Sequence, residues 1–226
     1  MIKSTIIFVL YLTVIGCSST ITAKKIPDSE YYQLTNTSFD RFIISDKEAL
    51  NNYTKIIFSP LKFNHLSIKS RDKKIANSWN FSTKDKVYYT TLLKDEIISV
   101  FASPNRDEDF VLGENKAKGT LYAEVRLLEF SPLVANYGET TSGTISRKAI
   151  ESYGGLSIQI LLVDSETNEF VAVLEDGREL AKVASTKIAV NKTTNSYLWK
   201  KTFNYWLKEL RSDLTKIKND SATPKT

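Results

Sequence analysis

The sequence predicts an α+β fold, in which a mainly antiparallel sheet is covered on one face by two helices. Residues 120–130 alternate between apolar and polar side chains, which is typical of a half-buried strand. Residues 156–163 and 170–174 flank a polar turn and predict a hairpin. Residues 199–217 repeat large apolar side chains every three or four positions, as one face of a helix does. A chain of 226 residues, 42% of them hydrophobic, is long enough to build one core, so we expect one domain.

The N-terminus has the anatomy of a signal peptide. Lys3 supplies a positive charge, and residues 6–15 form an apolar run. A helix that crosses a membrane needs about 20 apolar residues, so this run is too short to be one. The four residues that end at Cys17, Val-Ile-Gly-Cys, resemble the bacterial lipobox, and this resemblance implies cleavage before Cys17. We therefore expect residues 1–16 to be a lipoprotein signal peptide.

Cys17 is the only cysteine of the chain, and it lies where a lipobox requires one. The resemblance implies a diacylglycerol on its sulfur and a further acyl chain, such as palmitate, on its amino group. Each buried methylene contributes about 0.8 kcal/mol, so several chains anchor a protein stably. Ser18, and not Asp, follows the cysteine, which in the sorting of enterobacterial lipoproteins favours the outer membrane. We expect a lipid anchor in the cell outer membrane, with the protein facing the periplasm.

Residues 17–50 are predicted to form a lipidated tether followed by a strap that packs on the domain. Thr, Asn, Ser and Lys dominate this segment, and it lacks sustained periodicity. Its second half is too apolar for a linker, because it carries Tyr31, Tyr32, Leu34, Phe39 and Phe42. A single α+β domain is expected at residues 51–218, and a disordered tail at residues 219–226.

The first half of the domain is predicted to hold two strands and one helix. Residues 55–59 are rich in β-branched and aromatic side chains and are stopped by a proline, which indicates a core strand. A helix is expected to begin after Ser82, whose hydroxyl suits the cap, with Asp85 in the first turn. It ends before Pro104, and residues 110–112 predict a short strand.

The last helix allows two interpretations. Trp199, Trp206 and the other large apolar residues fall on one face, while lysines such as Lys200 and Lys208 lie off it. We favour a helix that covers the apolar face of the sheet, because an antiparallel sheet needs such a cover. The alternative is a helix that contacts lipid or lipopolysaccharide through its Trp and Lys side chains.

The composition excludes most catalytic chemistry. His65 is the only histidine, so it forms no two-histidine metal site, and no partner residues for a catalytic role are evident. Neither a phosphate-binding loop nor a dinucleotide fingerprint is present. We therefore expect no catalytic residue, no metal and no cofactor. A net charge of +5 without a basic stripe also argues against nucleic acid as a partner.

A long connection at residues 131–155 separates two predicted strands. Loops longer than about 12 to 15 residues are usually functional or flexible. Asn136, Tyr137 and Tyr153 lie in this segment and are the candidate residues for binding a partner. Simple flexibility of the loop is the alternative.

Several segments of the mature chain together carry a family resemblance. They are Tyr31–Leu34, Tyr53–Pro60, Gly154-Gly155, Asp164–Thr167 followed by Val171-Ala172, and the final helix with Trp199, Phe203 and Trp206. This set resembles the bacterial lipoproteins that carry the domain of unknown function 3313. The resemblance implies an envelope lipoprotein with one α+β domain and brings no established activity. Two positions depart from it: Asn168 stands where glycine is expected, and Gln159 where an acidic residue is common.

The predicted function is a non-enzymatic, lipid-anchored module that binds or scaffolds an envelope protein in the periplasm, and its oligomeric state stays open. We interpret Asp164 and Ser165 as structural, because both side chains can bond local N–H groups in a hairpin turn. The alternative is a hydrolase or transferase that acts on cell-wall or glycan material. That activity would need two converging carboxylates, or a base beside Asp164 and Ser165.

Overall fold

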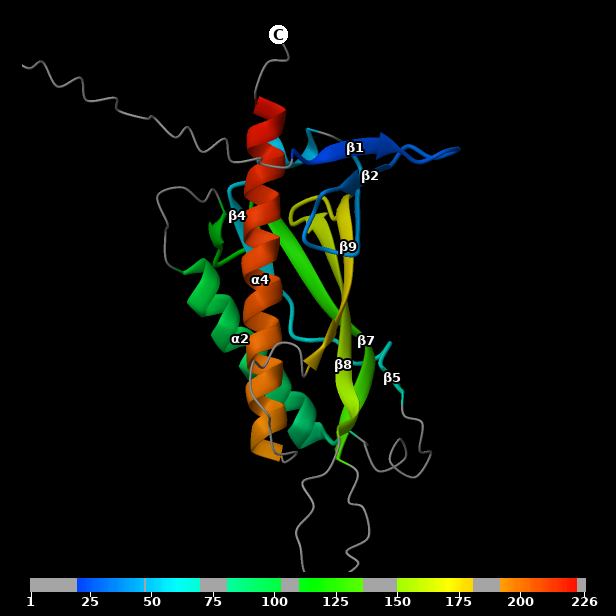
Figure 1. The fold of residues 1–226 in the computed structure, drawn as a ribbon. Coiled ribbons are helices and arrows are strands. Elements are labelled where there is room, and N and C mark those ends of the chain that lie inside the picture. The colour runs from blue at the N-terminus through cyan, green and yellow to red at the C-terminus, as the bar shows by residue number, and fades with distance from the viewer. Residues whose placement is uncertain are drawn as a thin grey trace, which may run out of the picture.

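Over the residues that it describes, the computed structural model has an open, mixed sheet of nine strands and two α-helices, so the predicted α+β class is confirmed (Figure 1). The strand order is β1-β2-β3-β9-β8-β7-β4-β6, and β5 pairs with β7. The description covers residues 20–46, 48–69, 81–102, 110–135, 150–180 and 192–222. The predicted signal peptide and Cys17 lie outside these ranges.

Three long antiparallel strands form the centre of the sheet: β7 (Thr120–Ala135), β8 (Ile150–Asp164) and β9 (Phe170–Glu179). The β8–β9 hairpin confirms the turn predicted between residues 164 and 170. Strands β7 and β8 are longer than the alternation indicated, because Ser131 pairs with Gly155 and Leu133 with Tyr153. The expected loop at 131–155 is therefore wrong at both ends, where the chain is strand.

Three short strands pair in parallel at one side of the sheet. The predicted strand at residues 55–59 is β4 (Lys55–Phe58), which lies between β7 and β6 (Val111–Leu112). β5 (Ser67–Ile68) pairs with the later part of β7. The sheet is thus mainly antiparallel with a parallel edge.

The segment expected to be an irregular strap contains three strands. β1 (Thr22–Lys25), β2 (Tyr32–Thr35) and β3 (Arg41–Ile44) form an antiparallel run, and β3 pairs with β9. Phe42 and Ile44 are fully buried. These three strands of the segment are therefore part of the sheet.

Two helices lie on one face of the sheet (Figure 1). α2 (Thr83–Phe101) begins as predicted: the Ser82 hydroxyl accepts a hydrogen bond from the Asp85 N–H, and the Asp85 carboxylate accepts one from the Ser82 N–H. α4 (Lys192–Ala222) runs beside α2. Because α4 extends to Ala222, residues 219–222 of the expected disordered tail are helical.

An aromatic cluster fills the space between the helices and the sheet. Trp199 of α4 is fully buried, and its ring centroid lies 4.1 Å from that of Tyr89 and 5.4 Å from that of Phe130. Trp206 is 2% exposed. Lipid contact through these two tryptophans is therefore ruled out, and the interpretation of α4 as a cover is the right one. None of the described helices is both long enough and apolar enough to cross a membrane.

Candidate functional site

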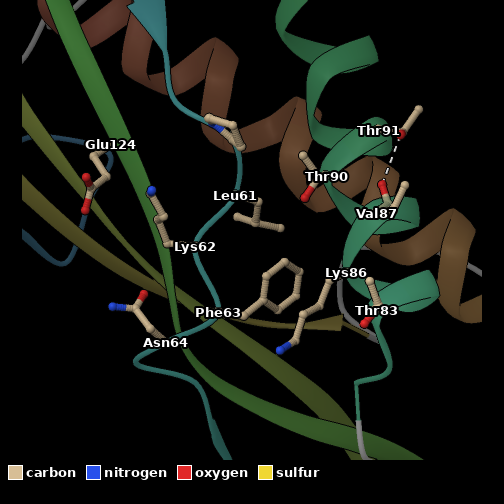
Figure 2. A pocket seen from close by; sticks show the side chains of 11 residues that line it. Leu61, Lys62, Phe63, Asn64, Thr83, Lys86, Val87, Thr90, Thr91 and Glu124 are labelled. Atoms are coloured by element: carbon tan, nitrogen blue, oxygen red, sulfur yellow. Dashed lines mark hydrogen bonds between the residues drawn. The ribbon is translucent and has the colours of Figure 1, made fainter.

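An open groove of about 880 Å³ lies between α2 and the segment 60–64 that follows β4 (Figure 2). Phe63 and Val87 contribute apolar surface, and Val87 is 61% exposed, whereas Leu61 lines the groove but is only 5% exposed. Polar groups come from both sides of the groove: Lys62, Asn64 and Glu124 from the sheet side, and Thr83, Lys86, Thr90 and Thr91 from α2. An apolar surface with a few polar groups is typical of a binding site.

The backbone of segment 60–64 forms hydrogen bonds with β7 on one of its sides only. Pro60 has no N–H and ends β4, yet the chain continues along β7. The Lys62 N–H donates to Val125 O at 2.9 Å, and its C=O accepts from the Leu127 N–H at 2.9 Å. Successive residues of an extended chain direct these groups to opposite sides, so Leu61 directs its N–H and C=O away from β7. Neither group bonds another backbone group of the described residues.

Only some of the charged side chains that line the groove form ion pairs. Glu124 is the one carboxylate among the described lining residues, and its Oε1 accepts a hydrogen bond from Arg126 Nε at 2.6 Å. Among the described residues, Lys62 and Lys86 form no ion pair through their ammonium groups. Because Glu124 is neutralised by Arg126, the two lysines leave the groove with a positive balance.

Arg126 also begins a row of polar side chains that crosses four strands. It donates from Nη1 to Gln159 Oε1 at 3.0 Å, and Gln159 Nε2 donates to Glu175 Oε1 at 2.7 Å. Arg41 of β3 completes the row through Glu175 Oε2 at 3.3 Å. The four residues are direct register partners on β7, β8, β9 and β3. The amide of Gln159 serves as both acceptor and donor, which explains a neutral residue at this position.

The Asp164–Thr167 turn is held by its own hydrogen bonds. Asp164 Oδ1 accepts from the N–H groups of Glu166 at 2.8 Å and Thr167 at 2.9 Å, and these bonds lower the pKa of Asp164. Tyr53 donates its hydroxyl to Asp164 Oδ2 at 2.9 Å, and burial raises the pKa of that phenol. The Ser165 hydroxyl contacts the backbone of Ala117. Asp164 and Ser165 therefore both form hydrogen bonds within the fold, which agrees with the interpretation of these two residues as structural.

Asn168 explains how this turn forms without the expected glycine. Its φ is 60°, in the left-handed region that glycine adopts freely and that asparagine tolerates best among the other residues. The departure from the family pattern at this position therefore leaves the backbone conformation of the turn intact.

None of the described residues singled out from the sequence lines the groove. Asn136 and Tyr137 lie outside the described residues. Tyr153 belongs to β8 and pairs with Leu133, so it stands in a strand and not in a loop. His65 is exposed beside Asn64 of the groove, with 3.0 Å between Asn64 Nδ2 and His65 Nε2. No group of three His, Cys, Asp or Glu side chains suited to a metal occurs in the described part of the chain.

The groove residues were missed because none belongs to a motif. The sequence offers one signal: after Pro60 the pattern Leu-Lys-Phe-Asn still alternates apolar and polar side chains, as an extended chain beside a sheet does. Its position opposite α2 depends on the pairing of Lys62 with Arg126, which are distant in sequence.

No family model matches the chain, and no curated protein matches it. Solved structures that match it include the PelC dodecamer from Paraburkholderia phytofirmans, at 9% identity and a TM-score of 0.32, covering 72% of this chain and 91% of that one. A DUF330 protein from Xanthomonas campestris matches at 9% identity and a TM-score of 0.38, covering 76% of this chain and 91% of that one. Likenesses this remote assign neither family nor function, and membership of the family with domain of unknown function 3313 stays a prediction.

Proposed function

We propose that this protein is a lipid-anchored, non-enzymatic module of the cell envelope, related to the domain of unknown function 3313 lipoproteins, that holds an envelope protein at the groove beside α2. The groove is the observation that carries the proposal. It offers the apolar side chains of Phe63 and Val87 next to hydroxyl, amide and ammonium groups. Such a surface suits a polypeptide, whose side chains and backbone need both kinds of contact.

The open edge of segment 60–64 supports an extended partner segment. The side chains of such a segment can contact Phe63 and Val87, and its backbone can bond the N–H and C=O of Leu61 once this residue, which is 5% exposed, is uncovered. The ammonium groups of Lys62 and Lys86 favour acidic residues in that segment, because Arg126 already neutralises Glu124. We therefore expect an extended, acidic segment of a periplasmic or outer-membrane protein.

The anchor is the second part of the proposal. Cys17, lipidated after removal of residues 1–16, would hold the domain at the periplasmic face of the outer membrane. Fractionation tests this part: the native protein should leave the membrane with detergent and not with high salt, and Cys17→Ser should remain soluble. Release of the native protein by salt alone would contradict the anchor.

Site-specific photocrosslinking in cells tests the groove. A photoreactive amino acid at Val87 should crosslink one envelope protein, and the same amino acid at Ile98 should not. Both residues are exposed on α2, at 61% and 45%, but Ile98 lies outside the groove. Lys62→Glu combined with Lys86→Glu should abolish the Val87 crosslink. A crosslink that survives this double substitution, or equal crosslinking at Ile98, would contradict binding at the groove.

No observation favours the alternative, a hydrolase or transferase acting on cell-wall or glycan material. The described lining of the groove holds one carboxylate, and glycoside cleavage usually uses two. Asp164 and Ser165 are occupied by turn and backbone hydrogen bonds.

A further inference from the structure

The face of the sheet opposite the helices carries apolar side chains in two neighbouring rows. In the first row, Ile57, Tyr122, Val163 and Phe170 are register partners on β4, β7, β8 and β9. In the second row, Leu161 pairs with Val173 and Val173 pairs with Ile43, and the β7 member of this row is Glu124, which pairs with Leu161. Ile43 is 7% exposed, and the others are half-buried. We call the seven apolar residues of these two rows the outer apolar face.

This face differs from the solvated side of an ordinary antiparallel sheet. Such a side carries polar residues at every second position, whereas a strand buried on both sides is apolar almost throughout. Residues 160–163 of β8 read Ile-Leu-Leu-Val, so Leu161 and Val163 point outward while Ile160 and Leu162 are buried. Both described helices lie on the other face (Figure 1). The sequence of β8 is therefore that of a strand with a second cover.

We propose that a second copy of this chain packs on the outer apolar face, about a two-fold axis close to the direction of β8. Such an axis places β7 of one copy opposite β9 of the other, and each residue of β8 opposite itself. Leu161 and Val163 then meet their own counterparts. Tyr122 of each copy then lies opposite Phe170 of the other copy.

Charge complementarity is the argument for a second copy over another occupant. The polar row borders the outer apolar face and reads Arg41, Glu175, Gln159, Arg126 across the strands. The same axis puts Arg126 of each copy opposite Glu175 of the other, and Gln159 opposite Gln159. It also puts Glu124 opposite Val173 of the other copy, where Arg126 of its own chain neutralises Glu124. Arg126 and Glu175 each keep an ion pair within their own chain, with Glu124 and Arg41, so the contacts between copies add to these pairs. At the rim, Arg41 faces Lys62, but the Arg41 side chain is 52% exposed, so solvent screens this repulsion.

The area of the outer apolar face indicates how strongly two copies can associate. Four strands about 4.8 Å apart, over six residues of about 3.3 Å each, cover roughly 400 Å² per copy. A stable interface buries about 800 Å² per partner, so the dimer is weak and depends on concentration. The lipid anchor of the proposed function would confine copies to one surface and raise their effective concentration.

Sedimentation velocity on the mature chain with Cys17→Ser tests the proposal, from about 1 to about 500 µM. We expect a reversible monomer–dimer equilibrium. Arg126→Glu and Glu175→Arg should each weaken self-association at least about tenfold, because each sets like charges opposite each other. An equimolar mixture of these two variants should dimerise again, since both pairs between copies then have opposite charges. Fold effects within one chain cannot produce this rescue.

Leu161→Arg and Ile98→Arg form the matched pair for the apolar part. Leu161→Arg should prevent dimerisation, whereas Ile98→Arg, on the exposed side of α2, should not. Circular dichroism checks that each variant is folded. A chain that stays monomeric at the highest concentration, a mixture that does not regain dimers, or loss of the dimer by Ile98→Arg would each overturn the proposal.

Discussion

The β8–β9 turn and the aromatic cluster under α4 are held together in opposite ways. In the turn, Asp164 bonds the N–H groups of residues two and three positions ahead, and most of the groups involved are exposed. In the cluster, Trp199 contacts Tyr89 and Phe130, which belong to other elements, and it is fully buried. Hydrogen bonds and backbone conformation therefore govern the turn, and removal of apolar surface from water governs the cluster. Substitutions in the two regions should differ in size accordingly.

Trp199→Ala should have the largest effect. It removes a fully buried indole and leaves a cavity lined by Tyr89, Phe130 and Phe203, so the free energy of unfolding should fall by about 3–5 kcal/mol. Urea denaturation of the soluble chain measures it. Tyr197→Ala, two residues earlier on α4 and 49% exposed, is the control and should change the free energy by less than about 0.5 kcal/mol. Similar losses for both would mean that α4 is not the cover of this sheet.

Asn168→Ala should have the largest effect in the turn. At a φ of 60° an alanine Cβ approaches the following carbonyl, which costs about 1–2 kcal/mol. Asn168→Gly is the matched control and should leave the free energy of unfolding unchanged or slightly raised. Equal stability of the Ala and Gly variants, measured by urea denaturation, would contradict the left-handed conformation.

Tyr53→Phe should have a smaller effect. It removes the hydroxyl that donates to Asp164 Oδ2 and keeps the ring, which is 8% exposed. The expected loss in the free energy of unfolding is about 0.5–1.5 kcal/mol. Tyr197→Phe is the control for loss of an exposed hydroxyl. In the Asp164→Asn background the effect of Tyr53→Phe should shrink, and an undiminished effect would show that the hydroxyl acts elsewhere.

The parts of the fold that the sequence predicted are those with short-range causes. The Ser82–Asp85 capping box, the turn after Asp164 and the apolar stripe of α4 each depend on residues within a few positions or on one helical period. β3 was missed because its four residues carry little periodicity. It is a strand because β9 supplies the pairing partner.

The groove could not be predicted either, because it depends on a pairing between strands that the sequence alone does not specify. Its two sides, segment 60–64 and α2, are near each other in the sequence, but their separation is set by the parallel pairing of β4 with β7. The outer apolar face was visible in part, since the apolar run of β8 was recognised as a strand. Which residues share this face could be told only from the register of β8 with its neighbours, which places Leu161 beside Val173 and away from the helices.

The pH dependence of stability should distinguish a carboxylate that contacts a distant segment, Asp213, from one that bonds its own turn, Asp164. Asp213 of α4 is fully buried and accepts hydrogen bonds from the Ser38 N–H at 2.7 Å and the Ser38 hydroxyl at 3.2 Å, with Lys216 Nζ at 3.8 Å. Burial nevertheless raises the pKa of Asp213 above its ordinary value of 3.8. The pKa of Asp164 is lowered, chiefly by the Thr167 N–H. The two carboxyl groups should therefore respond to pH in opposite directions.

The sign follows from the proton balance of folding. A raised folded pKa means that Asp213 stabilises the fold most at low pH, and that this contribution is lost as the pH rises from about 4 through the folded pKa. Asp164 contributes above about pH 4, and its contribution is lost as the pH falls through its lowered pKa. The difference in free energy of unfolding between wild type and Asp213→Asn should thus fall as the pH rises, and that for Asp164→Asn should fall as the pH drops. Urea titrations from about pH 2.5 to 7 measure both. Slopes of the same sign would mean that Asp213 is charged and solvated in the folded protein, and that the contact between α4 and Ser38 is looser than the structure has it.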